Sequence, residues 1–360
     1  MANPIKSTII GSYPKPEYIV GDITGHKTVL IGKILSDLEK KVGPEKYQTL
    51  INCAVNQAID DQNDSGINIV TDGEQRREHY VTYVLRKLKG FDFEDMCKKE
   101  VKKFISGKFQ TAYTVLAPIV VSRVEHNGPF LVSDFEYASK RTNREVKVTI
   151  PGPSTVVDHV KNMFYKSDKE LAFGYSKAIR KEVSALKRAG CKIIQFDDPG
   201  LLRNLTRSEE WGISALDTCF AGIDVTIVVH VCRSYPNKKY EKKNVAYKSD
   251  LGYYPHLLNL LQKSSIDQIS IEAKQGNLDP SILKNLGSKT VILGCIDVGN
   301  ERVETVNEII DQAKAALRYI KPEQLVLGPD CGLLELSRES SKTKLTNLAR
   351  ASEILNSQIS

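Results

Sequence analysis

Short apolar runs, rich in valine and isoleucine, recur eight times along the chain. Their apolar positions do not alternate with polar ones, which is typical of parallel strands that are buried on both faces. Polar residues or turn formers follow most runs. We predict strands at 5–12, 67–72, 146–150, 192–197, 225–232, 268–272, 290–297 and 324–328.

Helical patterns separate most of these runs. Ile179, Val183 and Leu186 share one face of a predicted helix, which stops before Gly190, as expected for a C-terminal glycine. Similar apolar stripes lie between the seventh and eighth runs and after the eighth. Eight strands that alternate with helices predict an α/β fold, the (β/α)8 or TIM barrel, and a doubly wound open sheet is the second choice.

Two stretches are longer than simple connections. Residues 90–144 contain β-like segments of their own at 111–121 and 129–132, so we interpret them as an inserted β-rich lobe after strand two. Residues 13–41 are expected to form a loop over the barrel mouth. Because we find no internal repeat and no low-complexity linker, we predict that residues 1–360 form a single (β/α)8 barrel domain.

The predicted strands end in residues that carry chemistry. In TIM barrels the C-terminal ends of the strands meet at one rim, where the active site lies. Residues far apart in the sequence are therefore expected to converge there. The candidates are Ser12, Glu74, Asp197, Asp198, His230, Cys232, Glu272, Asp297 and Cys331.

His230 and Cys232 are the most informative of these candidates. They stand two apart on a strand, so both side chains point to the same side and can bind one ion. Such a pair alone is weak evidence for a metal. However, Cys331 lies in a Gly-Pro-Asp-Cys-Gly turn, and Glu272 ends an apolar strand, where an unpaired carboxylate is costly. Two sulfurs, one nitrogen and one oxygen suit tetrahedral Zn2+.

Composition narrows the class of protein. The chain has 360 residues, of which 41% are hydrophobic and 26% charged, which is ordinary for a soluble globular protein. No apolar run reaches the ~18–20 residues of a membrane span, and we see no secretory signal. A cytoplasmic location with no membrane partner is therefore expected, and there the seven cysteines stay reduced. The net charge of +7 is mild, and no nucleic-acid-binding motif accompanies the lysine runs, so no nucleic-acid partner is expected.

Eight motifs resemble the catalytic domain of the cobalamin-independent methionine synthase family, in the family's order and over nearly the whole chain. They are IIGSYP, TDGEQRR, IPGPST, IIQFDDPGL, VVHVC, ISIEA, GCIDVGNERVET and LGPDCGL. The resemblance implies a (β/α)8 barrel, in agreement with the strand count. It further implies a zinc-dependent methyltransferase that moves a methyl group to the thiol of homocysteine and forms methionine. Full-length members have two similar barrels, whereas this chain has the length of one.

The resemblance implies the metal ligands. Zn2+ would be bound by His230, Cys232, Glu272 and Cys331. A thiolate is the nucleophile in such a transfer, and zinc keeps a bound thiol deprotonated near neutral pH. These four residues are among the nine candidates that the strand pattern places at the rim.

The resemblance also implies the contacts to the acceptor. Ser12 would contact the carboxylate of homocysteine, and Glu74 and Asp197 would contact its amino group. Two carboxylates suit an ammonium group, which supports this assignment. Asp198, Asp297 and Tyr13 are candidates for residues that surround the ligands of the site, and of these Asp198 and Asp297 are the candidate catalytic residues.

Two family residues tied to the methyl donor are missing. Folate-using members carry a tryptophan shortly after the Gly-Pro turn, but residues 154–159 contain none, and the sole tryptophan is Trp211. Those members also have a proton-shuttle histidine after strand seven, where this chain has Gly299. We therefore expect methylcobalamin or a corrinoid protein as donor rather than methyltetrahydrofolate. His159 is a candidate for part of the missing proton transfer.

Two other functions stay open at this point. A different thiol such as coenzyme M, as in relatives that open epoxides, has a sulfonate that Arg76, Arg77 or Arg233 would bind. It has no ammonium group, so Glu74 and Asp197 would be left without a partner. The missing histidine also leaves open a non-catalytic zinc-binding or corrinoid-docking protein.

Overall fold

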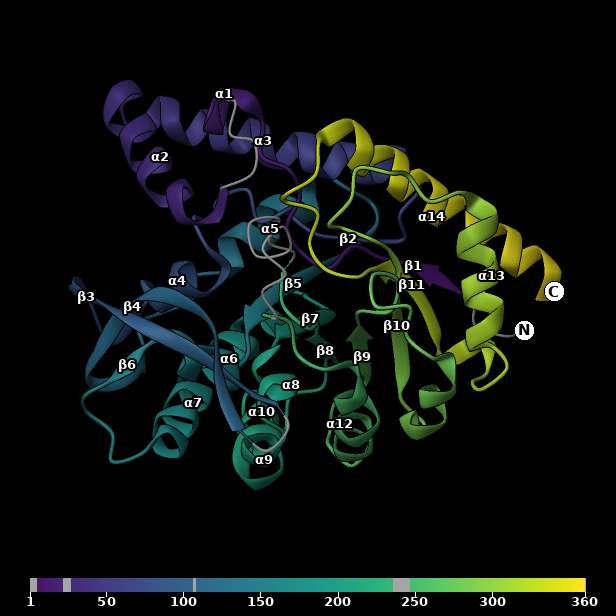
Figure 1. The fold of residues 1–360 in the computed structure, drawn as a ribbon. Helices are drawn as coiled ribbons and strands as arrows, with labels where there is room; N and C mark the ends of the chain where they lie inside the picture. Colours follow the sequence, from purple (N-terminus) through teal and green to yellow (C-terminus); the bar gives the residue numbers. More distant parts are fainter. Residues whose placement is uncertain (1–4, 22–26, 106–107, 236–246, 360) are drawn as a thin grey trace.

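Eight parallel strands form the centre of the molecule (Figure 1). The computed structural model describes residues 5–21, 27–105, 108–235 and 247–359. The strands are β1 (Lys6–Ser7), β2 (Ile69–Val70), β5 (Glu145–Pro151), β7 (Ile193–Asp197), β8 (Thr226–Val231), β9 (Gln268–Ile271), β10 (Thr290–Ile296) and β11 (Leu325–Pro329).

The strands close into a barrel. Their spatial order is β1-β11-β10-β9-β8-β7-β5-β2, and a parallel bridge between Thr8 and Ile69 joins the first strand of this order to the last. Each of the eight predicted strands overlaps an observed one. The prediction of a (β/α)8 barrel with an inserted segment after strand two is therefore confirmed, and the open sheet is wrong.

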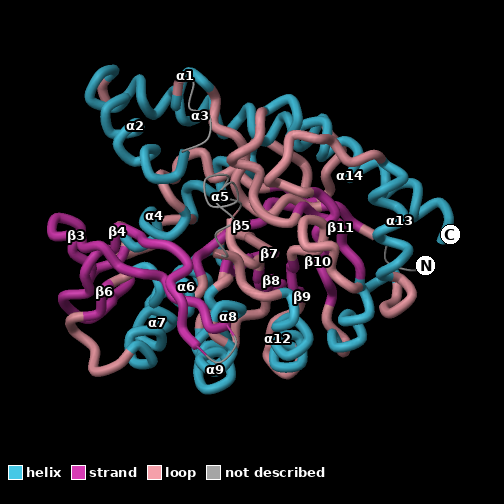
Figure 2. The backbone as a smooth tube through the Cα atoms, in the orientation of Figure 1, coloured by secondary structure: helices cyan, strands magenta, loops and turns pink. Residues whose placement is uncertain are grey.

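Helices surround the strands (Figure 2). Ile179, Val183 and Leu186 are buried on α7, and Gly190 ends this connection with a φ of +95° that favours glycine. The α-helices are α1 (Glu17–Val20), α2 (Lys27–Val42), α3 (Pro44–Asp64), α4 (Tyr80–Leu85), α5 (Val132–Lys140), α6 (Pro153–His159), α7 (Asp168–Arg188), α8 (Gly200–Arg203), α9 (Leu205–Arg207), α10 (Ile213–Thr218), α12 (Tyr254–Leu261), α13 (Val306–Ala316) and α14 (Arg338–Ile359). Segments of π or 3-10 helix are η1 (Ser208–Gly212), η2 (Leu251–Tyr253), η3 (Pro280–Leu286) and η4 (Pro322–Gln324).

The inserted segment after β2 is a long antiparallel hairpin. Strands β3 (Leu88–Ile105) and β4 (Lys108–His126) pair with each other, and β6 (Lys161–Asn162) joins the edge of β4. The hairpin projects to one side of the barrel (Figure 1). Helix α5 follows it, so the β-like segment expected at 129–132 is wrong. Phe135 and Ala138, three positions apart, are buried on one face of α5, which favours a helix there. The division into one domain with a lobe at 90–144 stays a prediction.

The loop expected at 13–41 is also wrong in part, because α1 and α2 lie within it. Ile31 and Leu35 are four positions apart on α2 and pack against Ile51 and Ala54 of α3. Burial of this apolar stripe stabilises the helix. Among the described residues, no helix is long and apolar enough to cross a membrane.

A buried ion pair fixes the loop that follows β10. Lys344 of α14 is fully buried, and its amine lies 2.9 Å from a carboxylate oxygen of Glu304. The same amine donates to the carbonyl of Asp297 at 3.0 Å, and Glu304 accepts from the Asp297 N–H at 3.0 Å. Removing one partner of such a pair leaves the other charge buried without compensation.

We expect Lys344→Met to lower the free energy of unfolding by about 3–5 kcal/mol, because Glu304 then stays buried without its cation. Urea unfolding followed by circular dichroism measures the change. The double variant Lys344→Met/Glu304→Gln should recover a large part of the loss. A loss of less than about 1 kcal/mol in the single variant would contradict this role of the pair.

Candidate functional site

Three of the predicted ligands lie together at the rim of the barrel. His230 lies near the end of β8 and Cys232 directly follows that strand, whereas Cys331 follows β11, which is not a neighbour of β8 in the barrel. One ligand atom from each residue lies within 4.8 Å of the others, and all three residues are buried. The sulfur atoms of Cys232 and Cys331 are 3.8 Å apart. We refer to these three residues as the His/Cys/Cys cluster.

The His/Cys/Cys cluster fits a tetrahedral metal ion. Two thiolates that each lie about 2.3 Å from one tetrahedral ion are about 3.8 Å apart, which is the separation seen here. Nδ1 of His230 lies 2.9 Å from the hydroxyl of Ser270, so the ring is oriented from outside the cluster. Nε2 of His230 is buried and has no partner among the described residues. A buried nitrogen without a partner is rare, and a metal would provide one.

The cluster also favours a thiolate. The hydrogen bond from the Cys331 thiol lowers the pKa of Cys232 well below its ordinary value, and His230 acts in the same direction. Burial works against the imidazolium of His230, but the charge of Cys232, its hydrogen bond and the charge of Asp197 together outweigh burial and raise the pKa of His230. A low thiol pKa is what a metal ligand or a nucleophile requires.

Glu272 does not join this cluster in the structure. One carboxylate oxygen lies 2.9 Å from the amine of Lys248, and the other accepts from the backbone N–H of Arg233 at 3.1 Å. Burial raises the pKa of Glu272, and Lys248 opposes that rise. Its place among the metal ligands stays a prediction.

Asp330 ties two parts of the rim together. Its carboxylate accepts the backbone N–H groups of Ala273 and Lys274 at 2.8 Å and of Gln275 at 2.7 Å. These residues follow Glu272 directly, and Asp330 precedes Cys331. Burial raises the pKa of Asp330 to about 7. The loop after β9 is therefore held against the loop that carries Cys331.

The proposed acceptor contacts lie beside the cluster. Asp197 is in register with His230 on the neighbouring strand. Burial raises the pKa of Asp197 to about 7, and the charge of Glu74 adds to that rise, so the two carboxylates interact. Ser12 packs against Gly332, next to Cys331: a Cβ on Gly332 would meet its hydroxyl at 2.1 Å.

An unusual backbone turn orients the side chain of Glu74. Its φ is +55°, which only a few non-glycine residues adopt and which signals a constraint. One carboxylate oxygen accepts from the hydroxyl of Thr149 at 2.6 Å and lies 3.3 Å from the guanidinium of Arg77. The amine of Lys15 donates to the carbonyls of Glu74 and Gln75 at 3.0 and 2.7 Å and holds the turn.

The two candidate catalytic aspartates already have local partners. The Asp198 carboxylate accepts the backbone N–H and the hydroxyl of Thr155 at 2.7 and 2.8 Å, and burial raises its pKa to about 6. Asp297 is half-buried and accepts the N–H of Gly299 at 2.8 Å. These contacts indicate that Asp198 holds α6 in place and that Asp297 holds the loop after β10. The catalytic role of both aspartates stays a prediction.

Sequence reasoning missed several residues that orient the site. Ser270 is on β9, two positions before Glu272, and its hydroxyl contacts His230. Because side chains two positions apart on a strand point to the same side, its place in the site could have been predicted. Asp330 lay next to Cys331 in the same motif. Lys248 gave no signal, because it reaches Glu272 from a distant segment.

Comparisons with known proteins agree with this geometry. The model of the family described as "Cobalamin-independent synthase, Catalytic domain" matches residues 5–354. A methionine synthase from Sulfurisphaera tokodaii is 33% identical over 356 residues, which cover 99% of this chain and 94% of the relative. One from Saccharolobus solfataricus is 31% identical over 360 residues, with 99% and 96% covered.

A solved structure is similar over its whole length. The B12-independent methionine synthase from Shewanella sp. W3-18-1, in complex with selenomethionine, has a TM-score of 0.85 and 28% identity, and the match covers 99% of both chains. A structure from Listeria monocytogenes, described as a putative vitamin-B12 independent methionine synthase, has a TM-score of 0.71 at 17% identity and supports the fold alone.

We expect Asp330→Asn to weaken metal binding by about 10–100-fold, because an amide replaces one of the oxygens that accept from the loop after β9. Co2+ is the probe, since thiolate coordination gives it a distinctive absorption, and competition with a chelator gives the affinity. Asp279→Asn is the matched control, because Asp279 also accepts a backbone N–H, from Ser281, in an exposed turn. Equal Co2+ affinity in Asp330→Asn and wild type would contradict the positioning role.

Proposed function

We propose that this chain, which belongs to the family of cobalamin-independent synthase catalytic domains, transfers a methyl group to the thiol of homocysteine and forms methionine. The observation that carries the proposal is the His/Cys/Cys cluster beside two buried carboxylates, Glu74 and Asp197. A thiol and an ammonium group of one small molecule would be bound at these two adjacent places.

Zinc is the metal that we propose for the His/Cys/Cys cluster. His230, Cys232 and Cys331 would hold it, and Glu272 would be the fourth ligand after its carboxylate turns away from Lys248. When bound, zinc keeps the thiol of the acceptor deprotonated near neutral pH, which makes its sulfur a nucleophile. Ser270 keeps the imidazole of His230 oriented, and Asp330 keeps the two ligand-bearing loops together.

The acceptor would be held by its amino-acid end. Glu74 and Asp197 would bind the ammonium group, and Ser12 would contact the carboxylate. Gln195 donates to the Asp197 carboxylate at 2.7 Å and so orients it. These contacts fix the sulfur of the acceptor in line with the methyl carbon of the donor, and such orientation lowers the barrier to transfer.

We propose a methylcorrinoid as the methyl donor, methylcobalamin or a corrinoid protein, rather than methyltetrahydrofolate. Trp211 is buried in η1, with the guanidinium of Arg207 5.8 Å from its ring, rather than on α6 after the Gly-Pro turn. Gly299 offers only its backbone N–H, which donates to Asp297. Neither residue can replace the pterin-stacking or the proton-shuttle side chain of folate-using members.

Coenzyme M has less support as the acceptor. The three arginines considered for its sulfonate all have carboxylate partners: Arg76 lies 3.2 Å from Asp134, Arg77 3.3 Å from Glu74, and Arg233 3.6 Å from Glu272. The names of the relatives also point to methionine synthesis.

The zinc-loaded protein should form methionine from homocysteine and methylcobalamin, and Cys331→Ser should lose this activity by at least about 100-fold, because a thiolate ligand is lost. Methionine is measured by chromatography, with methyltetrahydrofolate as the second donor. Methionine from methyltetrahydrofolate alone would contradict the donor assignment. If no donor supports the reaction while zinc is bound, methyl transfer to homocysteine is wrong.

Binding of the amino-acid end should depend on pH. Burial raises the pKa of Asp197 to about 7, so its carboxylate becomes largely protonated below that pH and then attracts an ammonium group less. In the metal-free protein we expect the affinity for methionine, which has no thiol proton, to rise by up to about tenfold between pH 6 and pH 8. Titration calorimetry measures it.

The control for this pH dependence is Asp197→Asn. It should bind methionine about 10–100-fold more weakly at pH 8, because a charge-assisted hydrogen bond is lost, and its affinity should vary less with pH. A wild-type affinity that is flat from pH 6 to pH 8 would count against Asp197 as the ammonium contact.

A further inference from the structure

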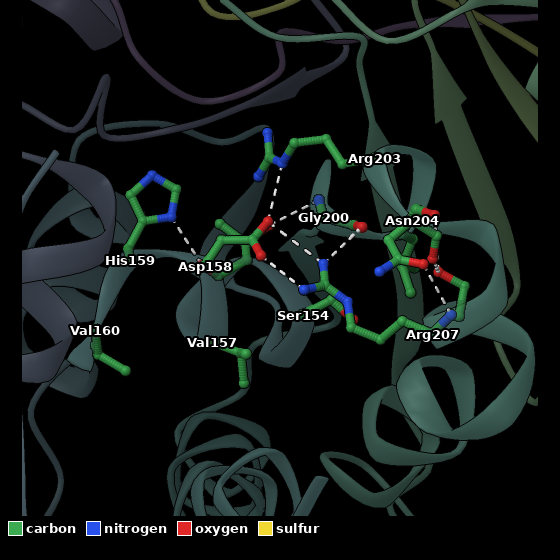
Figure 3. A network of polar contacts seen from close by, with 12 residues as sticks. Ser154, Val157, Asp158, His159, Val160, Gly200, Arg203, Asn204 and Arg207 are labelled. Carbon is green, nitrogen blue, oxygen red and sulfur yellow. Dashed lines mark hydrogen bonds and ion pairs between the residues drawn. The ribbon is translucent and has the colours of Figure 1, made fainter. Parts of the chain in front are cut away.

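A second buried charged group lies at the rim, apart from the residues used so far. Arg203 of α8 is only 2% exposed and is among the largest fully buried side chains. Its Nε donates to the carboxylate of Asp158 on α6 at 2.9 Å. Figure 3 shows this carboxylate between Arg203 and Arg207. We call these three residues the Arg/Asp/Arg group.

The Arg/Asp/Arg group carries an excess positive charge. Arg207 binds both oxygens of Asp158, at 2.6 and 3.3 Å, so two guanidinium groups share one carboxylate. Burial opposes ionisation of Asp158, but Arg207 and Arg203 outweigh it and lower its pKa to about 2. Asp198, the next carboxylate, accepts from Ser154 and Thr155, and the charge of Arg207 opposes the rise of its pKa that burial causes, so Asp198 offsets part of the charge of Arg207 but makes no hydrogen bond to Arg203. A buried charge that is not compensated is costly, so an anion would stabilise this group.

Arg203 has unused hydrogen-bonding capacity. Its Nη2 is buried without a partner, and among the described residues it is the only terminal arginine nitrogen in that state. Arg207, by contrast, uses both of its Nη atoms, on Asp158 and on the carbonyl of Gly200. A buried donor without a partner is rare in folded proteins, and here the donor is charged.

One aromatic ring lies beside Arg203, and two more lie beside that ring or each other. The ring of Tyr113, which the inserted hairpin contributes, lies 5.9 Å from the guanidinium carbon. His159 lies 6.2 Å from Tyr113 and 6.5 Å from Tyr80, between ring centres. Burial lowers the pKa of His159 to about 3, so its ring is neutral and does not add a further cation. Figure 3 shows His159 on the same helix as Asp158.

The Arg/Asp/Arg group lies close to the His/Cys/Cys cluster. Burial and the neighbouring Tyr113 are the main causes of the raised pKa of Tyr80, and the charge of Cys232 also contributes to it. Cys232 also contributes to the raised pKa of Tyr113, although burial is the main cause. The two tyrosines therefore lie near both groups. Tyr113 is on β4 of the hairpin and Tyr80 begins α4, whereas the proposed acceptor contacts are Asp197 at the end of β7 and Ser12 and Glu74 in the loops after β1 and β2.

We propose that Arg203 binds an oxyanion, a carboxylate or a phosphate, that belongs to the methyl donor. This inference rests on the proposed methyl transfer for the identity of the molecule, but the oxyanion site itself does not. The unpartnered Nη2 of a planar guanidinium can donate a charge-assisted hydrogen bond to an oxygen of such a group. Arg203 would then determine which donors are accepted, because a donor without an oxyanion leaves the charge buried and uncompensated.

The first test uses inorganic phosphate as the probe, in the full-length protein. Titration calorimetry should detect phosphate binding in wild type and at least tenfold weaker binding in Arg203→Gln. Arg203→Lys keeps the positive charge but loses the planar guanidinium, so its affinity for phosphate should lie between those of wild type and Arg203→Gln. Arg141→Gln is the matched control, because it removes an arginine that is paired with an exposed aspartate, Asp60.

A second variant separates an oxyanion site from a structural ion pair. Asp158→Asn removes the competing anion and should bind phosphate at least as tightly as wild type, whereas a merely structural group would be damaged by either substitution. Circular dichroism and Co2+ binding at the His/Cys/Cys cluster show that each variant is folded. Phosphate binding that is equal in wild type and Arg203→Gln, or absent in wild type, overturns the proposal.

Steady-state kinetics then link the site to the donor. Phosphate should compete with the donor and not with homocysteine, and Arg203→Gln should raise KM for the donor about tenfold or more with KM for homocysteine unchanged. Competition with homocysteine would overturn the assignment to the donor. If no donor yields methionine, the proposed function fails, whereas phosphate binding that depends on Arg203 would still establish the oxyanion site.

Discussion

Closure of the ring of eight strands is the constraint on which the site depends. Buried backbone N–H and C=O groups need partners, and the bridge between Thr8 and Ile69 joins the two strands that would otherwise be edges. Closure brings the end of β8 opposite the end of β11. His230, Cys232 and Cys331 thereby come within 4.8 Å of one another, although 99 positions separate the two cysteines.

The sequence predicted this framework because continuous apolar runs identify strands that are buried on both faces, and because a barrel collects their polar ends. It did not predict what depends on contacts between distant segments. The carboxylate of Glu272 is bound to Lys248, and helix α5 stands where a β segment was expected. The adjacent Asp197 and Asp198 have different partners, as the alternation of side chains along a strand requires.

The buried charges at the rim correspond to the parts of the proposed substrates. The two carboxylates, Glu74 and Asp197, suit an ammonium group, and the His/Cys/Cys cluster suits a metal-bound thiol. On the other side, Arg203 has a positive charge that Asp158 only partly compensates. Each group is costly to bury alone, so bound substrate would recover part of that cost. The inserted hairpin supplies Tyr113, whose ring lies 5.9 Å from the guanidinium carbon of Arg203, and Lys103, whose amine donates to the carbonyl of Lys248.

X-ray absorption at the zinc edge, with and without homocysteine, tests the central claim most directly because it requires no methyl donor. The account predicts that the zinc-loaded protein has two sulfur ligands and gains a third, at about 2.3 Å, when homocysteine is added. The Cys232→Ser variant should begin with one sulfur fewer. An unchanged number of sulfur ligands after homocysteine is added, at a concentration that saturates binding, would contradict the claim that the acceptor thiol binds the metal.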